Sequence, residues 1–257
     1  MEFQDKIVGI TGVGNVYGIG YAIARTFLQE GAKVFICGSK PENLKKVEES
    51  LAEYGTVKAY VADVTDSGAL KAMFDGAMQE FGRLDIFINN AGIYPQQQIC
   101  DMTEEEWDRV MAVNLKSVFL CAKLCRETMK EGGVLINAAS FATLMGSVCS
   151  GAYASSKAAV HMLTKVLAAE LAPYKIRVND YIPGVIQTQM TQPVIDARAD
   201  ALLSAIPMRR LGAPQEVADA VLFLASDKAS YITGTSIEIS GGKLCVQNPS
   251  LAWDLYE

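Results

Sequence analysis

Metal-binding residues are scarce in this sequence. It has a single histidine, His161, and none of its six cysteines forms a Cys-x-x-Cys pair or another metal-ligand spacing. Zinc sites draw mainly on clustered histidine and cysteine ligands, so we expect no metal site. We interpret the cysteines as reduced thiols, which are typical of a cytoplasmic protein.

Long hydrophobic runs and clustered basic residues are also missing. No apolar run approaches the ~18 residues that span a bilayer, and the first residues lack the basic and apolar regions of a secretory signal. The chain has 23 lysine and arginine residues against 29 aspartate and glutamate residues, which gives a net charge of −6. Nucleic-acid binding needs a clustered basic surface. We therefore expect neither a nucleic-acid nor a membrane partner.

Apolar residues, in contrast, make up 50% of the 257 residues, which is enough to bury a full core. Segments of strand length alternate with segments of helix length from end to end. Strands are predicted at Ile7–Thr11, Lys33–Cys37, Val57–Val61, Leu84–Asn89, Gly133–Asn137, Ile176–Ile182 and Ser236–Ile239. Helices are predicted near 19–30, 41–53, 66–81, 104–130, 153–171 and 214–226. Several of the strands are apolar without alternation, which indicates burial on both faces.

This alternation predicts a single α/β domain over residues 1–257. Its expected architecture is a Rossmann-like, doubly wound parallel sheet of about seven strands with helices on both faces. The segment near 185–213 does not fit a strand–helix unit and is rich in Gln, Thr and Ala. Long irregular insertions in compact domains are often functional, so we predict a substrate lid there.

A glycine-rich loop connects the first predicted strand to the first predicted helix. Residues 8–20 read VGITGVGNVYGIG, with glycines at positions 12, 14, 18 and 20. Glycines let the backbone turn sharply and approach a pyrophosphate, whose charge then lies at the helix N-terminus. The loop therefore predicts a dinucleotide-binding site.

The end of the second predicted strand indicates which dinucleotide binds. An acidic residue about 20 positions beyond the glycines would bind the ribose 2′-hydroxyl of NAD. The residue 20 positions beyond Gly18 is Gly38, and Ser39 and Lys40 follow it. A hydroxyl and a cation suit a 2′-phosphate, so the sequence favours NADP, with NAD as the alternative.

A tyrosine and a lysine four residues apart, Tyr153 and Lys157, lie on one face of a predicted helix. A cation beside a phenol stabilises the phenolate and favours proton exchange near neutral pH. The same spacing recurs at Tyr54 and Lys58, where Gly55 interrupts the helix. Ser140 follows a predicted strand, at the edge of the sheet where ligands bind in such folds.

At these positions the sequence resembles the short-chain dehydrogenase/reductase family, and the likeness covers nearly the whole chain. The matching motifs are Thr11-Gly12 with Gly18-Ile19-Gly20, Asp63-Val64, Asn89-Asn90-Ala91-Gly92, Asn114, Ser140, Tyr153, Lys157 and Pro183-Gly184. The resemblance implies a nicotinamide cofactor and a homotetramer. The predicted helices 104–130 and 153–171 carry apolar residues on more than one face, as twofold contacts between subunits require.

The resemblance also implies the role of each catalytic residue. Tyr153 would be the acid/base, Ser140 would hold the substrate oxygen, and Lys157 would lower the pKa of Tyr153 and bind the nicotinamide ribose. Asn114 would position Lys157 through water. Together with Ser39 and Lys40, the implied cofactor-binding residues are Gly12, Gly18, Ile19, Asp63, Val64, Asn90, Gly92, Tyr153, Lys157, Pro183, Gly184 and Thr188.

The glycine loop departs from the family pattern. The family has three residues between its first two glycines, whereas five residues, Val13 to Tyr17, separate Gly12 from Gly18 here. The pattern therefore does not assign the phosphate contacts inside this loop.

The favoured function is NAD(P)(H)-linked interconversion of a ketone and a secondary alcohol. The segments that face the substrate by family analogy, 93–99, 141–152 and 184–190, contain no charged residue. They favour a neutral hydrophobic ketone or alcohol such as a hydroxysteroid. Reduction of a 3-oxoacyl carrier protein and oxidation of a sugar or polyol are alternatives, and a non-catalytic dinucleotide-binding regulator is the alternative of another class. Enoyl reduction is disfavoured because those relatives space tyrosine and lysine more widely.

Overall fold

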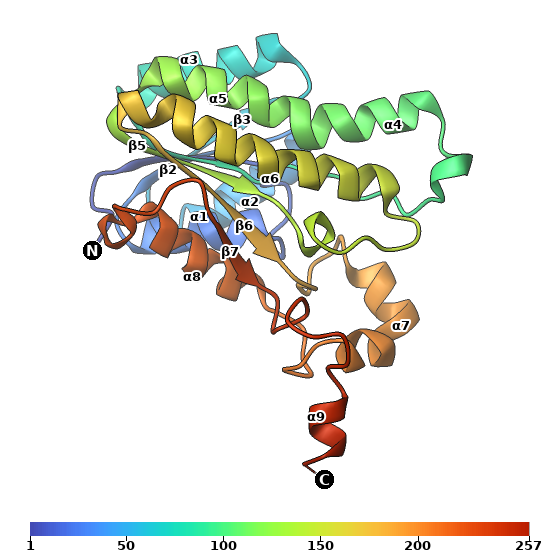
Figure 1. Cartoon of the computed structure of the whole chain (residues 1–257). Coiled ribbons are helices and arrows are strands. Elements are labelled where there is room, and N and C mark those ends of the chain that lie inside the picture. Colours follow the sequence, from blue (N-terminus) through green and yellow to red (C-terminus); the bar gives the residue numbers. More distant parts are fainter. Residues whose placement is uncertain (257) are drawn as a thin grey trace.

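The computed structural model describes residues 1–256 and contains one sheet of seven parallel strands (Figure 1). The strands are β1 (Ile7–Thr11), β2 (Lys33–Gly38), β3 (Val57–Val61), β4 (Leu84–Asn89), β5 (Met129–Ala138), β6 (Arg177–Pro183) and β7 (Ser236–Ile239). Their order is β3-β2-β1-β4-β5-β6-β7. The order reverses between β1 and β4, which opens a crevice at the carboxyl edge of the sheet. The predicted doubly wound α/β fold is confirmed.

Helices cover both faces of this sheet. The α-helices of the described residues are α1 (Ile19–Gln29), α2 (Pro41–Leu51), α3 (Ser67–Phe81), α4 (Glu104–Met111), α5 (Ser117–Thr128), α6 (Gly151–Leu171), α7 (Gln192–Ser204), α8 (Pro214–Ala225) and α9 (Leu251–Asp254). Helices α3, α5 and α6 lie on one face, and α1, α2 and α8 lie on the other (Figure 1). Pro41 and Pro214 each occupy a first helical turn, as predicted.

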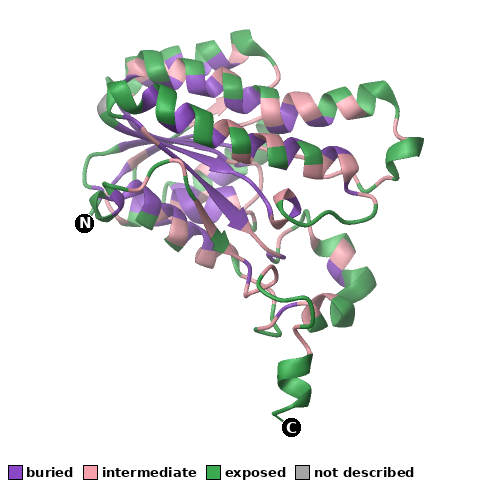
Figure 2. Cartoon of the chain, in the orientation of Figure 1, coloured by how far each residue is buried: buried purple, intermediate pink, exposed green. Residues whose placement is uncertain are grey.

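The central strands are buried on both faces, and this explains their uninterrupted apolar sequences. In β2, Val34 and Ile36 belong to the core under α1 and α8, whereas Phe35 and Cys37 belong to the core under α3 and α5. Side chains in a strand alternate between the two faces, so each face needs its own apolar set. Figure 2 shows the strands buried between helices that are exposed on their outer sides.

The predicted helix over 104–130 is wrong, because it consists of two helices. The capping box of Thr103 and Glu106 starts α4 as the sequence indicates, but a π-helical turn at 112–116 separates α4 from α5. A π turn needs no proline or glycine, so the apolar pattern runs through it without a signal.

The fifth strand starts earlier than predicted, at Met129, and a register shift against β4 lies within it. Gly132 has a φ of 93°, a conformation that glycine adopts easily. The pair Gly132-Gly133 marks an irregularity inside the strand, whereas the sequence suggested that the strand begins there.

The segment near 185–213 leaves the sheet and returns to it. A bridge between Ile186 and Gly212 closes its base, and α7, with a kink at Arg198, lies inside it. In Figure 1 this segment and α9 lie beyond the carboxyl end of β7.

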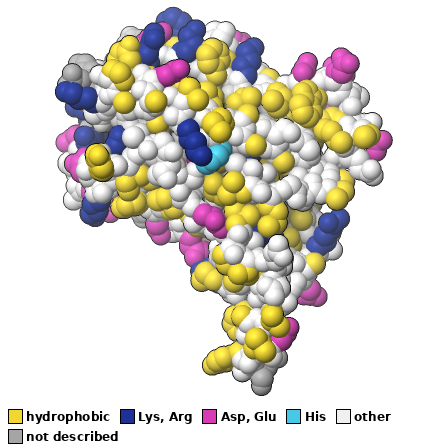
Figure 3. All heavy atoms as spheres, viewed as in Figure 1, with side chains coloured by type: hydrophobic (Ala, Val, Ile, Leu, Met, Phe, Trp, Pro, Cys, Tyr) yellow, Lys and Arg dark blue, Asp and Glu magenta, His cyan; other side chains and the backbone are white. Residues whose placement is uncertain are grey.

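Apolar side chains are frequent on the surface over α5 and α6 (Figure 3). Phe119 of α5 and Met162 and Val166 of α6 are exposed there. His161 on α6 shares hydrogen bonds with Asp180 of β6 and Ser236 of β7, so its ring is packed against these strands. No helix in residues 1–256 is long and apolar enough to cross a membrane.

Candidate active site

The glycine loop is pressed against the turn that follows β4. Gly12 has a φ of 73°, and a Cβ on it would lie 2.6 Å from the Cα of Ala91. The side chain of Asn90 donates to the Gly12 carbonyl at 3.1 Å, which holds the two loops together. Only glycine fits both the backbone angle and the space at position 12. Gly18 is the N-cap residue of α1, and the first residues of this helix, with their free N–H groups, line the cleft at the sheet edge.

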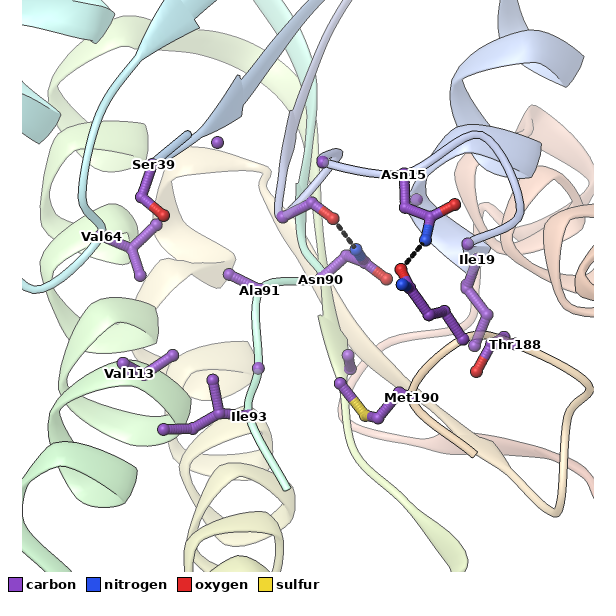
Figure 4. A pocket seen from close by; sticks show the side chains of 18 of the residues that line it. Asn15, Ile19, Ser39, Val64, Asn90, Ala91, Ile93, Val113, Thr188 and Met190 are labelled. Atoms are coloured by element: carbon purple, nitrogen blue, oxygen red, sulfur yellow. Dashed lines mark hydrogen bonds between the residues drawn. The ribbon is translucent and has the colours of Figure 1, made fainter. Parts of the chain in front are cut away.

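A cleft of about 510 Å³ runs along the carboxyl edge of the sheet. Twelve of the predicted site residues line it: Gly12, Gly18, Ile19, Ser39, Asp63, Val64, Asn90, Gly92, Tyr153, Lys157, Pro183 and Thr188. In Figure 4, Ser39 and Val64 lie at one end, Thr188 and Met190 at the other, and Asn90 and Ala91 between them. Segments far apart in the sequence thus meet in one elongated site.

The other predicted residues lie outside this lining. Ser140 and Asn114 are buried behind it. Gly184 packs against the next loop, since a Cβ on it would lie 2.7 Å from the Cα of Ser240. Lys40 is exposed at the start of α2 and does not line the cleft.

Tyr153 and Ser140 form the polar centre of the site. Burial raises the pKa of Tyr153 above its usual value, while a hydrogen bond from Ser140 opposes the shift. Burial is the largest of these effects, so the pKa of Tyr153 is raised overall, and the lowering by Lys157 that the resemblance implies stays a prediction. The phenol is therefore fully protonated at neutral pH and is able to donate its proton.

Lys157 is buried one helical turn beyond the tyrosine. Its Nζ lies 5.8 Å from the centroid of the Tyr153 ring and donates to the carbonyl of Ala138 at 2.7 Å. Burial lowers the pKa of Lys157 from 10.5 to about 8. The ammonium is thus charged at neutral pH and places a positive charge beside the phenol.

Asn114, in the π-helical turn, ties the loop after β4 to α6. Its Oδ1 accepts from the N–H of Ile93 at 2.8 Å, and its Nδ2 donates to the Ile93 carbonyl and to Ser156 Oγ, each at 3.0 Å. Ser156 in turn donates to the carbonyl of Tyr153 at 2.7 Å. Asn114 therefore fixes the position of the helix that carries Tyr153 and Lys157.

Three features of the cleft have no signal in the sequence. Asn15, within the lengthened glycine loop, hydrogen-bonds Gln189 across the cleft (Figure 4). Tyr181 donates to Asn90 at 3.0 Å. Arg109 lines the cleft beside Asp63, whose pKa is lowered by hydrogen bonds from Thr65 and also by this arginine. Each contact joins segments whose proximity depends on the folded chain.

The buried lysine predicts a pH dependence of stability. Between pH 8 and 10.5, the unfolded chain holds a proton on Lys157 that the folded chain has lost. The contribution of Lys157 to the free energy of unfolding therefore rises with pH in that window, by at most about 1.4 kcal/mol per pH unit. We expect wild type to gain stability relative to Lys157→Met from pH 8 to 10, measured by urea unfolding. Parallel pH profiles for the two proteins would contradict a depressed pKa.

Comparison with known proteins gives consistent matches. A family model described as enoyl-(acyl carrier protein) reductase matches residues 12–243. A 3-oxoacyl-[acyl-carrier-protein] reductase from Thermotoga maritima is 41% identical over 245 residues, which are 94% of this chain and 99% of the relative. A 3alpha-hydroxysteroid dehydrogenase from Mediterraneibacter gnavus is 35% identical over 246 residues, 94% and 98% of the two chains. The crystal structure of a short-chain dehydrogenase/reductase (glucose/ribitol dehydrogenase) from Brucella melitensis has a TM-score of 0.89 at 33% identity and covers 95% of this chain and 99% of its own.

Proposed function

Because the chain belongs to the short-chain dehydrogenase/reductase family and is an oxidoreductase, we propose that it interconverts a ketone and a secondary alcohol with NADP(H). The observation that carries the proposal is the protonated, partly exposed Tyr153, hydrogen-bonded to the buried Ser140 and close to the buried ammonium of Lys157. A dinucleotide-binding regulator would have no use for these three polar groups, and the burial of Ser140 and Lys157 costs stability. An enzyme that transfers a proton needs all of them.

The cleft suits a dinucleotide. It is lined by the first residues of α1 and by Gly12, where a Cβ would fill the space against Ala91. The bound nicotinamide would supply the hydride. Ile19 and Thr188 would contact it at one end of the cleft, and Asp63 and Val64 would hold the adenine at the other.

The proton chemistry belongs to the side chains. In reduction, Ser140 donates a hydrogen bond to the substrate oxygen, and the Tyr153 hydroxyl gives that oxygen its proton while the carbonyl carbon accepts the hydride. Lys157 stabilises the phenolate that remains, and Asn114 holds α6 in place through Ile93 and Ser156. In oxidation the same groups act in reverse, with the phenolate as the base.

The preference for NADP over NAD is supported by Ser39. It lines the cleft at the end of β2, where family members that use NAD have an acidic residue. We expect Ser39→Asp to lower the ratio of kcat/KM for NADPH over NADH by about tenfold or more, because its carboxylate would repel the 2′-phosphate. Lys40→Glu should change the ratio less, since Lys40 does not line the cleft. An unchanged ratio in Ser39→Asp would show that the ribose 2′ position of the cofactor does not bind next to Ser39.

A mainly apolar ketone, such as a ketosteroid, is the proposed substrate class. Ile93 and Met190 give the cleft apolar walls, and a 3alpha-hydroxysteroid dehydrogenase is among the relatives. A 3-oxoacyl thioester is the second candidate, because a 3-oxoacyl reductase shares 41% identity with this chain. Oxidation of NADPH in the presence of a ketosteroid, a 3-oxoacyl thioester, a keto sugar or an enoyl thioester tests these classes. Activity on the enoyl thioester alone would contradict the proposal.

We further propose a cytoplasmic homotetramer with a lid at 185–213. The apolar residues Phe119, Met162 and Val166 on α5 and α6 would be buried by twofold contacts (Figure 3). All six cysteines are unpaired, the state that a reducing compartment maintains. The lid is supported by Thr188 and Met190, which begin the segment and line the cleft.

A further inference from the structure

Lys243 lies at the junction between the sheet, the lid segment and the loop that carries Ser140. It follows Gly241 and Gly242 after β7, and its N–H donates to Ser240 Oγ at 3.1 Å. The two glycines are packed against the end of the lid segment, because a Cβ on either would lie 3.0 Å from Ile206 or Pro207. The backbone at Lys243 is therefore held at the substrate side of the sheet.

The side chain of Lys243 points toward the catalytic loop. Its Nζ lies 5.3 Å from the centroid of the Phe141 ring, and Phe141 directly follows Ser140, the hydrogen-bond partner of Tyr153. Among the side chains that the structure describes, those of residues 1–129 and 132–256, none forms an ion pair or a hydrogen bond with the ammonium of Lys243. Within that part of the chain, the ammonium lies over the face of the Phe141 ring.

The arginines of the lid segment are either paired or exposed to solvent. Arg210 forms an ion pair and two hydrogen bonds with Glu216. Arg209 lies over the ring of Trp253, 5.3 Å from its centroid. Arg198 is exposed on α7, at the kink. Lys243 therefore differs from these arginines in being both partly buried and unpaired next to the catalytic loop.

Partial burial of an unpaired ammonium is unfavourable. It lowers the pKa of Lys243, and a cation–π contact recovers only about 0.5–2 kcal/mol. An anion that enters the site beside Phe141 would restore the lost solvation and form a charge-assisted hydrogen bond. The apolar segments around the reacting carbonyl contain no other group that could pair with such an anion.

We propose that Lys243 binds an anionic group on the substrate, so that the substrate is an apolar ketone with an acid remote from its reacting carbonyl. This inference rests on the proposed ketone reduction. It keeps the reacting end of the substrate neutral and apolar, and it places the acid beside Phe141. A carboxylate and a phosphate ester share the chemistry that Lys243 recognises.

The test compares matched acids and esters. Aliphatic and steroidal keto acids of increasing length, each with its methyl ester and, for one length, a phosphate ester, are assayed with wild type, Lys243→Met and Lys243→Arg. We expect one length at which wild type favours the acid over its ester by about tenfold in kcat/KM. Lys243→Met should lose this preference through KM while its kcat/KM for esters stays within about twofold, and Lys243→Arg should keep it.

Arg198→Gln is the control, because it removes a cation of the lid segment that is exposed at the kink of α7. It should keep the acid preference of wild type. The inference is wrong if no acid is preferred at any length, if Arg198→Gln abolishes the preference, or if Lys243→Met lowers kcat/KM for acid and ester equally. Turnover of esters without acid preference overturns only this inference, whereas absence of turnover with every ketone overturns the proposed function as well. The phosphate ester shows which kind of anion fits better.

Discussion

Replacing Tyr153 with phenylalanine is expected to reduce kcat for ketone reduction by roughly 10²–10⁴-fold, the usual contribution of a positioned general acid. The variant keeps the ring and its packing against the ring of Tyr94, whose centroid lies 4.7 Å from that of residue 153, so the shape of the cleft is preserved. Only the hydroxyl that donates the proton and bonds Ser140 is lost. The dissociation constant for NADPH, measured by fluorescence titration, should stay within about threefold of wild type.

Tyr54→Phe provides a matched control. Tyr54 has the same spacing to Lys58 as Tyr153 has to Lys157, but Tyr54 lies in the turn after α2 and Lys58 lies in β3. Its loss should leave kcat unchanged. If Tyr153→Phe retains more than about a hundredth of wild-type kcat, the proton comes from another group, and the assignment of Tyr153 as the acid is wrong.

Replacing Gly12 with alanine is expected to have the second largest effect. A Cβ there would lie 2.6 Å from the Cα of Ala91, and the alanine would have to adopt a φ of 73°, which residues other than glycine rarely do. The added strain should lower the free energy of unfolding by about 2 kcal/mol. The displaced loop would no longer present its N–H groups to the dinucleotide, so we expect the Kd for NADPH to rise roughly hundredfold.

Gly14→Ala separates the clash from a general effect of losing a glycine in this loop. Nothing lies within 4 Å of a Cβ built on Gly14, and its φ is not positive. Its unfolding curve should match that of wild type within about 0.5 kcal/mol. Equal destabilisation by Gly12→Ala and Gly14→Ala would contradict the tight contact between the glycine loop and Ala91.

The fold was predictable because its signals are local. Apolar runs such as Ile7–Thr11 and Leu84–Asn89 require burial on both faces, and proline at 41 and 214 indicates where helices begin. The π-helical turn at 112–116 was missed because it leaves the apolar pattern unbroken. The early start of β5 was missed because Gly132-Gly133 is typical of a strand boundary.

Part of the site was also predictable from local signals. The glycine loop and the Tyr153–Lys157 pair are short motifs that the sequence shows directly, whereas Ser140 and Asn114 were predicted from the family resemblance. The position of Lys243 beside Phe141 joins segments about a hundred residues apart, so only the folded chain shows it. The elevated pKa of Tyr153 also needed the structure, because burial, which sequence spacing does not measure, determines its direction.

The account rests on hydride transfer to a carbonyl carbon with protonation of its oxygen. The most direct test is reduction of a ketone with NADPH deuterated at the transferable position of the nicotinamide, followed by mass spectrometry and NMR of the product. We predict a secondary alcohol with one deuterium on the former carbonyl carbon, and no product from Tyr153→Phe on the same time scale. Deuterium on a former alkene carbon, or labelled NADPH that binds but is never consumed with any ketone, would contradict the account.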